Sequence, residues 1–202
     1  MKCVRLVPGI LCVALSLGVA GCGPKKEPAP PAPKVTAKEE PAPQVAPKEN
    51  AAKTTIAALP KLGEAPAWKL TDVNGQVVSS EDLKGKVVVV DFWATWCGPC
   101  RQEIPGYIEL AKKYGKDGLV IVGVSLDQEG PAVVKAFGQK FGVSYPLVMA
   151  DDDVQKAFGG LEVIPTTFLI DREGQVRDRK IGAVETAEYE QRILSVLKAG
   201  AE

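Results

Sequence analysis

The stretch TWCGPCRQEIP, residues 95–105, contains two cysteines with two residues between them. Such a pair binds a metal, forms a structural bridge or exchanges electrons. Structural zinc sites need about four cysteine or histidine ligands, whereas the chain has no histidine and no second CxxC pair. We therefore expect no metal site and no cofactor, and the choice lies between a structural and a redox-active disulfide.

Cys97 and Cys100 differ in the environment that the sequence predicts for them. A structural disulfide would suit an exported protein, but short loops gain the least stability from a bridge in the chain-entropy description. Cys97 directly precedes a predicted helix, whose N-terminal N–H groups and dipole favour a thiolate. Cys100 lies one turn further along, where it is shielded. An exposed Cys97 with a low pKa and a buried, resolving Cys100 would form a thiol–disulfide exchange site.

The cysteine pair follows the first of two strongly apolar runs. KVVVVDFWA, residues 86–94, and GLVIVGVSL, residues 118–126, are rich in β-branched residues, which is typical of strands covered on both faces. A helical pattern from Pro99 to about Tyr114 connects them, and a strand–helix–strand unit favours parallel strands. The sequence therefore predicts an α/β fold with Cys97 at a strand-to-helix turn.

The remaining pattern completes one domain. Asn74-Gly75 is a strong hairpin signal. The acidic run Asp151–Asp153 is typical of a helix start and lacks the spaced oxygen ligands of a calcium-binding loop. Four further elements are expected: a helix over residues 131–141, a strand over 146–150, a hairpin with its turn at 172–174 and a closing helix over 186–200.

The N-terminus is typical of an export signal. Lys2 and Arg5 precede the apolar run of residues 6–20, which is short for a membrane span and ends in small residues. VAGC, which ends at Cys22, resembles the bacterial lipobox, and this resemblance implies cleavage before Cys22 and attachment of lipid to its thiol. Residues 1–21 are thus predicted to be a lipoprotein signal peptide, with an uncleaved N-terminal anchor as the alternative.

Residues 22–61 are predicted to be a disordered, lipid-anchored linker. Pro, Ala, Lys and Glu dominate this segment and no aromatic residue is present, so burial of apolar surface cannot offset the chain entropy. Alternating Pro and Ala favours polyproline II at about 3.1 Å per residue, which gives a reach on the order of 100 Å. The formal net charge of the chain is +0, so we expect no nucleic-acid partner.

Two longer motifs resemble thioredoxin. VVVVDFWATWCGPCRQEIP resembles its active-site strand and helix, and IPTTFLID resembles its cis-proline strand. The lipobox, the hairpin at Asn74 and the extra helix after GLVIVGVSL are similar to features of membrane-tethered TlpA/ResA-type proteins. The resemblance implies a thioredoxin-like α/β domain over residues 62–202, with a central mixed sheet flanked by helices, an N-terminal β-hairpin and an extra helix inserted after the second parallel core strand.

The resemblance also implies roles for individual residues. Cys97 matches the attacking thiol and Cys100 the resolving thiol, so the two are expected to form a redox-active disulfide. Asp91 matches the buried acid of thioredoxin and Glu103 a glutamate near the site in ResA-type proteins, and both join the cysteines as expected catalytic residues. The expected client-binding residues are Trp96, Gly98, Pro99, Ile164 and the cis-proline Pro165.

Two positions depart from the related patterns. Gly123 stands where thioredoxin has the lysine that pairs with the buried acid. GGLEVIPTT replaces the GVxGxPET pattern of cytochrome-maturation reductases, which weakens an assignment to cytochrome c biogenesis.

Gly98 and Pro99 carry no charge, whereas strongly oxidising relatives have a histidine there that stabilises the reduced form. The Cys97–Cys100 pair should therefore act as a reductant. An oxidising compartment would keep such a pair as a disulfide, so a membrane electron donor is implied.

The expected function is reduction of client protein disulfides by a monomeric, exported oxidoreductase. A lipid anchor on Cys22 would hold the domain at a bacterial membrane, facing the periplasm or the cell exterior. Two alternatives stay open. A peroxiredoxin-like thiol peroxidase shares the fold, but its Pro-x-x-x-Thr-x-x-Cys context is not found around Cys97. A non-catalytic binding module with this fold is disfavoured by the intact CxxC pair.

Overall fold

The computed structural model describes residues 59–199. The predicted signal peptide, Cys22, Gly200 and nearly all of the predicted linker lie outside this range. Within residues 59–199, no helix combines the length and the apolar character that a membrane span requires. Leu59 already contacts the folded domain, because its carbonyl oxygen accepts a hydrogen bond from the Arg177 guanidinium at 3.0 Å.

A mixed sheet forms the centre of the domain. Its strands, in spatial order, are β1 (Gly63–Glu64), β8 (Gln175–Ile181), β7 (Thr166–Ile170), β4 (Val87–Trp93), β5 (Leu119–Ser125) and β6 (Leu147–Met149). As predicted, β4 and β5 are parallel, and β6 continues the parallel part. β7 and β8 form the predicted hairpin, and β7 pairs with β4 in the antiparallel direction. The expected mixed thioredoxin-like sheet is therefore confirmed.

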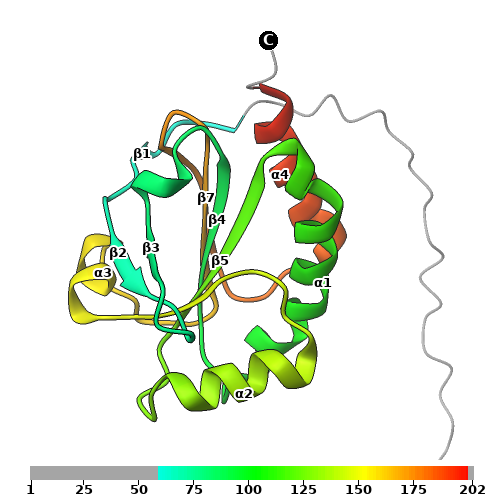
Figure 1. The fold of residues 1–202 in the computed structure, drawn as a ribbon. Coiled ribbons are helices and arrows are strands. Elements are labelled where there is room, and N and C mark those ends of the chain that lie inside the picture. The colour runs from blue at the N-terminus through cyan, green and yellow to red at the C-terminus, as the bar shows by residue number, and fades with distance from the viewer. Residues whose placement is uncertain (1–58, 200–202) are drawn as a thin grey trace, which may run out of the picture. The chain divides into compact units, whose positions relative to one another are not determined.

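Helices cover both faces of this sheet. The α-helices of the described residues are α1 (Gly98–Tyr114), α2 (Pro131–Phe141), α3 (Asp152–Ala157) and α4 (Thr186–Ala199), and short 3-10 turns span Glu81–Leu83 and Gly115–Asp117. Figure 1 shows α1 and α4 on one side of the sheet, α3 on the other and α2 across its lower end. The helix at 131–141 and the short helix at the acidic run agree with the sequence pattern.

The predicted N-terminal hairpin consists of β2 (Lys69–Thr71) and β3 (Val77–Ser79). The Asp72 carboxylate shapes its turn by accepting hydrogen bonds from the Asn74 and Gln76 N–H groups at 2.8 and 2.7 Å. Gly75 has a φ of +84° in this turn, a conformation that glycine adopts at low cost. The hairpin covers the same side of the sheet as α3 (Figure 1).

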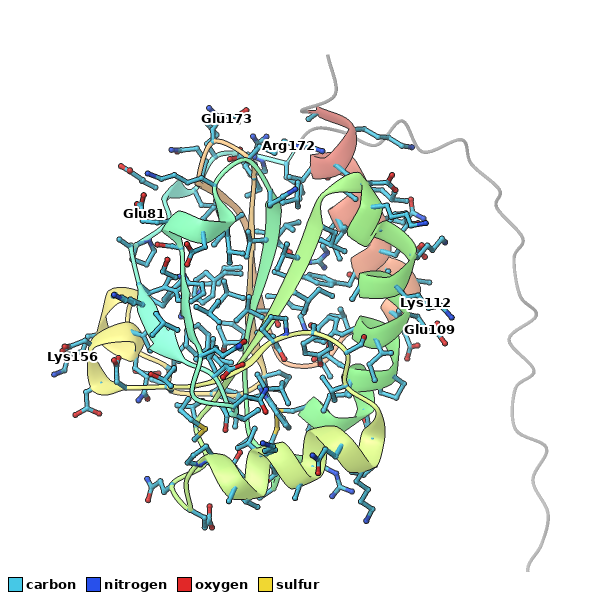
Figure 2. All side chains as sticks on the ribbon, in the orientation of Figure 1. Glu81, Glu109, Lys112, Lys156, Arg172 and Glu173 are labelled. Carbon is cyan, nitrogen blue, oxygen red and sulfur yellow. A yellow bond between two sulfur atoms is a disulfide. The ribbon has the colours of Figure 1, made fainter. Side chains whose placement is uncertain are left out.

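Side chains of β4 alternate between two cores. Val87, Val89 and Trp93 pack with α1 and α4, whereas Val88 and Phe92 pack with the hairpin and α3. Asp91 has the same parity as Val89 and Trp93, so its carboxyl group lies on the α1 side of the sheet. The charged residues Glu81, Glu109, Lys112, Lys156 and Glu173, which Figure 2 labels, are by contrast exposed. An acid inside one core therefore requires an explanation beyond packing.

Candidate active site

The disulfide between Cys97 and Cys100 lies at the start of α1, directly after β4, with an S–S distance of 2.07 Å. Cys97 is the N-cap residue of α1, and its Sγ accepts a hydrogen bond from the Cys100 N–H at 3.2 Å. In the reduced protein, the same N–H and the helix dipole would stabilise a thiolate on Cys97. The β4-to-α1 turn thus presents the sulfur where it can act as a nucleophile.

The predicted exposure of Cys97 is wrong in the disulfide form. Cys97 is 5% exposed and Cys100 is 1% exposed, so the two differ only in degree. The cause is local: Cys97 Sγ is bonded to Cys100 and lies 3.8 Å from the Ile164 carbonyl oxygen. The neighbouring Trp96, by contrast, is 64% exposed. A client must therefore approach the sulfur along a surface that the surrounding residues define.

The predicted client-binding residues lie on two sides of the disulfide. Trp96, Gly98 and Pro99 form the exposed turn that carries the cysteines. Across the sulfur, the peptide bond between Ile164 and Pro165 is cis, and Ile164 supplies the carbonyl oxygen next to Cys97 Sγ. These residues come from segments far apart in the chain, and the β4–β7 pairing brings them together.

Two further apolar side chains extend this surface. Val163 and Ile181 are 54% and 59% exposed and line a hollow of about 280 Å³ with Thr166 and Arg179. The hollow adjoins the cis-proline loop, since the Gly182 N–H donates a hydrogen bond to the Pro165 carbonyl oxygen at 2.8 Å. Exposed apolar side chains thus lie on the cysteine turn and beside the cis-proline loop, together with the charged Glu162 and Arg179 that also line the hollow.

Asp127 binds the loop that leads to Cys97 through hydrogen bonds to Thr95. Its carboxylate accepts hydrogen bonds from the Thr95 N–H at 2.9 Å, the Thr95 hydroxyl at 2.5 Å and the Ser125 hydroxyl at 2.8 Å. Asp127 is 6% exposed, so its carboxylate is largely shielded from water, whereas Thr95 is half-buried. This contact was not predicted from the sequence. The sequence feature that could have indicated it is the position of Asp127 just after β5, the parallel neighbour of the strand β4 that leads to Cys97.

Asp91 lies buried under the α1 helix and is 3% exposed. Its Oδ1 accepts a hydrogen bond from the Thr167 hydroxyl at 2.8 Å, and the Thr167 hydroxyl lies 3.3 Å from that of Tyr107. Burial is the main cause that raises the pKa of Asp91 from 3.8 to about 7, and the negative charge of Glu103 adds to it. The Thr167 hydrogen bond and the positive charge of Lys180 act in the opposite direction. Asp91 is thus poised to exchange a proton near neutral pH.

Glu103 and Lys180 form a buried ion pair next to this acid. Lys180 Nζ lies 2.5 Å from Glu103 Oε1, and the two side chains are 2% and 6% exposed. The Val184 N–H also donates to Glu103 Oε1 at 3.1 Å, while Oε2 has no partner among residues 59–199. Glu103 follows Cys100 by three positions, so the two share one face of α1. Lys180 was not predicted.

Gly123 shows why the cation does not come from β5. It pairs directly with Asp91, as the comparison with thioredoxin implies. A Cβ atom on Gly123 would lie 2.8 Å from Leu147 Cδ2 and 2.9 Å from Trp93 Nε1, so the space is already filled. Lys180 instead reaches the same region from β8.

The arrangement supports dithiol chemistry. It combines two sulfurs at a helix N-terminus, an adjoining apolar surface and a buried carboxyl group with a pKa near 7. Within residues 59–199, no group of three or more His, Cys, Asp or Glu side chains is placed to hold a metal ion.

Comparison with known proteins points to the same chemistry. The chain matches the AhpC/TSA family over residues 63–179. A thiol-disulfide oxidoreductase ResA of Bacillus thuringiensis is 40% identical over 121 residues, which cover 59% of this chain and 68% of that protein. The thioredoxin-like protein YneN of Bacillus subtilis is 33% identical over 132 residues, 64% of this chain and 76% of that protein.

Solved structures share the fold. A thiol:disulfide interchange protein of the thioredoxin family from Chlorobium tepidum is 34% identical and has a TM-score of 0.63, and the match covers 67% of this chain and 96% of that chain. The relatives named as oxidoreductases favour disulfide exchange over the peroxidase and the non-catalytic module. The chain therefore belongs to the AhpC/TSA family and is a thiol–disulfide oxidoreductase with a thioredoxin-like fold.

Proposed function

We infer that this enzyme reduces disulfide bonds of client proteins through Cys97 and Cys100. The observation that carries this function is the set of exposed apolar side chains, Trp96, Val163 and Ile181, on the turn that carries the cysteines and beside the cis-proline loop that contacts Cys97. A small thiol needs no such surface, whereas a polypeptide that covers it gains about 25 cal/mol per Å² of buried apolar area. Exposed apolar patches are typical of protein-binding sites.

The reaction proceeds through a mixed disulfide. The Cys97 thiolate attacks one sulfur of the client disulfide, a Cys97–client bond forms, and the other client sulfur leaves as a thiolate and takes up a proton. Cys100 then loses its proton and attacks Cys97 Sγ, and the client sulfur bound to Cys97 leaves as a thiolate and takes up a proton. The client gains two electrons and two protons, and the enzyme ends in the disulfide form that the structure shows.

Asp91 accepts the proton that Cys100 loses in the second step. A general base works best when its pKa lies near the working pH, and burial brings the pKa of Asp91 to about 7. Glu103, on the Cys100 face of α1, contributes a negative charge that makes Asp91 more basic. A buried acid that served packing alone would instead be costly to keep.

Export and a lipid anchor on Cys22 complete the proposal. They rest on the VAGC motif, the apolar run before it and the Pro- and Ala-rich segment after it. The uncharged Gly98-Pro99 pair between the cysteines supports a reducing role. A reducing protein in an oxidising compartment needs a source of electrons, so we include a membrane electron donor among its partners.

The proposed function is tested by trapping clients. Cys100→Ser removes the resolving thiol, so the first step should leave client proteins bound to Cys97 as mixed disulfides. These adducts should be released by dithiothreitol and identified by mass spectrometry, and Cys97→Ser serves as the matched control without the attacking thiol. If Cys100→Ser traps no protein while the wild type consumes hydrogen peroxide with a supplied thiol, the peroxidase alternative is correct.

A further inference from the structure

Lys180 is a charged side chain without access to solvent. Its ammonium group donates hydrogen bonds to Glu103 Oε1 at 2.5 Å and to the Gly182 carbonyl oxygen at 3.2 Å. It also lies 5.8 and 5.3 Å from the ring centroids of Tyr107 and Tyr189. A buried ion pair often adds no stability over an apolar pair of similar volume. Stability alone therefore does not account for a charged pair at this place.

Lys180 belongs to a row of residues that crosses the sheet. The register pairs Gly123 with Asp91, Asp91 with Thr167 and Thr167 with Lys180. Neighbouring strands lie about 4.8 Å apart, so two strand spacings bring Lys180 to roughly 10 Å from Asp91, measured along the backbone row. The Glu103 contact shows that the ammonium group lies on the α1 side, as does the Asp91 carboxyl group.

The groups that act on Asp91 come from several elements. Lys180 is the cation among them in the described residues, and it opposes the effects of burial and of Glu103. Its position cannot be taken over from β5, because a side chain at Gly123 would meet Trp93 and Leu147. The titratable and hydroxyl groups that interact with Asp91 are Glu103 and Tyr107 of α1, Thr167 of β7, Lys180 of β8, Tyr189 of α4 and Tyr145 before β6.

We propose that Lys180 is a positioning residue for disulfide exchange: held by Glu103, its charge keeps Asp91 able to accept a proton from Cys100 at neutral pH. Without a nearby positive charge, a buried carboxyl group stays protonated at higher pH. Asp91 would then hold its own proton when Cys100 needs to lose one. The inference rests on the proposed role of Asp91 in resolving the mixed disulfide.

The test compares two variants of the full chain that differ only at Lys180. Glu103→Gln keeps the lysine, and Glu103→Gln with Lys180→Met removes it without leaving an unpaired carboxylate. The titration midpoint of the Asp91 carboxyl carbon is measured by NMR in each reduced protein. The midpoint should be higher in the double variant by on the order of one pH unit, which is the effect of a nearby unit charge in a protein interior.

Arg179, a positively charged side chain at the surface, provides the matched control. Arg179 is the neighbour of Lys180 on β8, is exposed and lies over the Phe168 ring on the other face of the sheet. Arg179→Met should leave the Asp91 midpoint unchanged. Lys180→Met alone should raise the midpoint as the double variant does, which keeps the test usable if either Glu103 variant fails to fold. Equal Asp91 midpoints with and without Lys180 would show that the assignment is wrong.

Kinetics then separate this inference from the role of Asp91 itself. Resolution of a preformed mixed disulfide, followed by stopped flow, should be about fivefold slower at pH 7 in the double variant than in Glu103→Gln, because less Asp91 is ionised. The pH midpoint of this rate should move with the Asp91 titration. If the titration moves and the rate profile does not, Lys180 controls the charge of Asp91 but Asp91 does not serve as the base.

Discussion

Asp91 and Lys180 lie in one cross-strand row of the sheet, with Thr167 between them, beneath the helix that carries both cysteines. The row joins strands β4, β7 and β8, and the Lys180–Glu103 ion pair joins it to α1. The charged groups beneath α1 thus come from elements that are far apart in the chain and adjacent in the fold. Changes in these side chains should be visible in the pH dependence of stability and of exchange.

Asp91→Asn should remove a pH dependence of folding. Burial raises the pKa of Asp91 to about 7, while the unfolded value is near 3.9. Between these values the native state holds a proton that the unfolded state has lost, so the free energy of unfolding falls as the pH rises, by up to about 4 kcal/mol. Urea denaturation from pH 4 to 8 should show the free energy of unfolding of the variant rising relative to that of the wild type up to about pH 7. If the free energies of unfolding of the two proteins changed equally with pH, Asp91 would not be a buried acid with a raised pKa.

The same substitution should slow the second half of the reaction. Asn keeps the shape of Asp91 but cannot take a proton from Cys100. Formation of the Cys97–client disulfide should keep its rate, whereas its resolution should slow by about 10²-fold or more, in the range for loss of a general base. Rapid mixing with a model disulfide peptide resolves the two steps. A variant with wild-type rates at all pH values would leave Asp91 a structural residue.

Cys97 should react with alkylating reagents faster than Cys100 in the reduced protein. Cys97 caps α1 and accepts the Cys100 N–H bond, which favours its thiolate, whereas Cys100 is 1% exposed. Iodoacetamide labelling followed by peptide mass spectrometry gives both rates. Cys97 should also titrate below the free value of about 8.5. Equal labelling rates would contradict the assignment of attacking and resolving thiols.

Asp127→Ala should destabilise the domain and loosen the cysteine loop. The substitution leaves two half-buried Thr95 donors and the buried Ser125 hydroxyl without their acceptor, which we expect to cost about 2–4 kcal/mol. Urea denaturation at pH 7 measures this cost. Asp178→Ala is the control, because its ion pair with Arg192 is partly exposed and should contribute no more than about 1 kcal/mol. Similar losses in both variants would argue against a special role of Asp127.

Cys22→Ser should release the protein from the membrane fraction. Lipid attachment to the Cys22 thiol is the proposed anchor, and serine cannot form the thioether. Cell fractionation should find the variant among soluble proteins, and its reductase activity in solution should equal that of the wild type, since the Cys97–Cys100 site is untouched. A variant that stays fully in the membrane fraction would favour the uncleaved N-terminal anchor.

The sequence by itself determined the elements and the reacting pair. The β-branched runs of β4 and β5, the helical pattern after Pro99, the turn at Asn74-Gly75 and the CxxC spacing are local signals, and the structure agrees with each of them. Local signals suffice here because strand, helix and turn preferences depend on neighbours within a few residues. The disulfide at the mouth of α1 follows from them.

Only the tertiary structure decided which polar groups lie behind the disulfide. Residue types favour a buried Ile181 and an exposed Lys180, yet Lys180 is 3% exposed and Ile181 is 59% exposed. The register of β8 on β7 places Lys180 opposite Thr167 and next to Glu103, whose charge compensates for its burial. The burial of Cys97 beside Ile164 and the hold of Asp127 on Thr95 likewise depend on segments that are distant in the chain. Pairing between distant segments sets burial and charge compensation, and no local pattern encodes it.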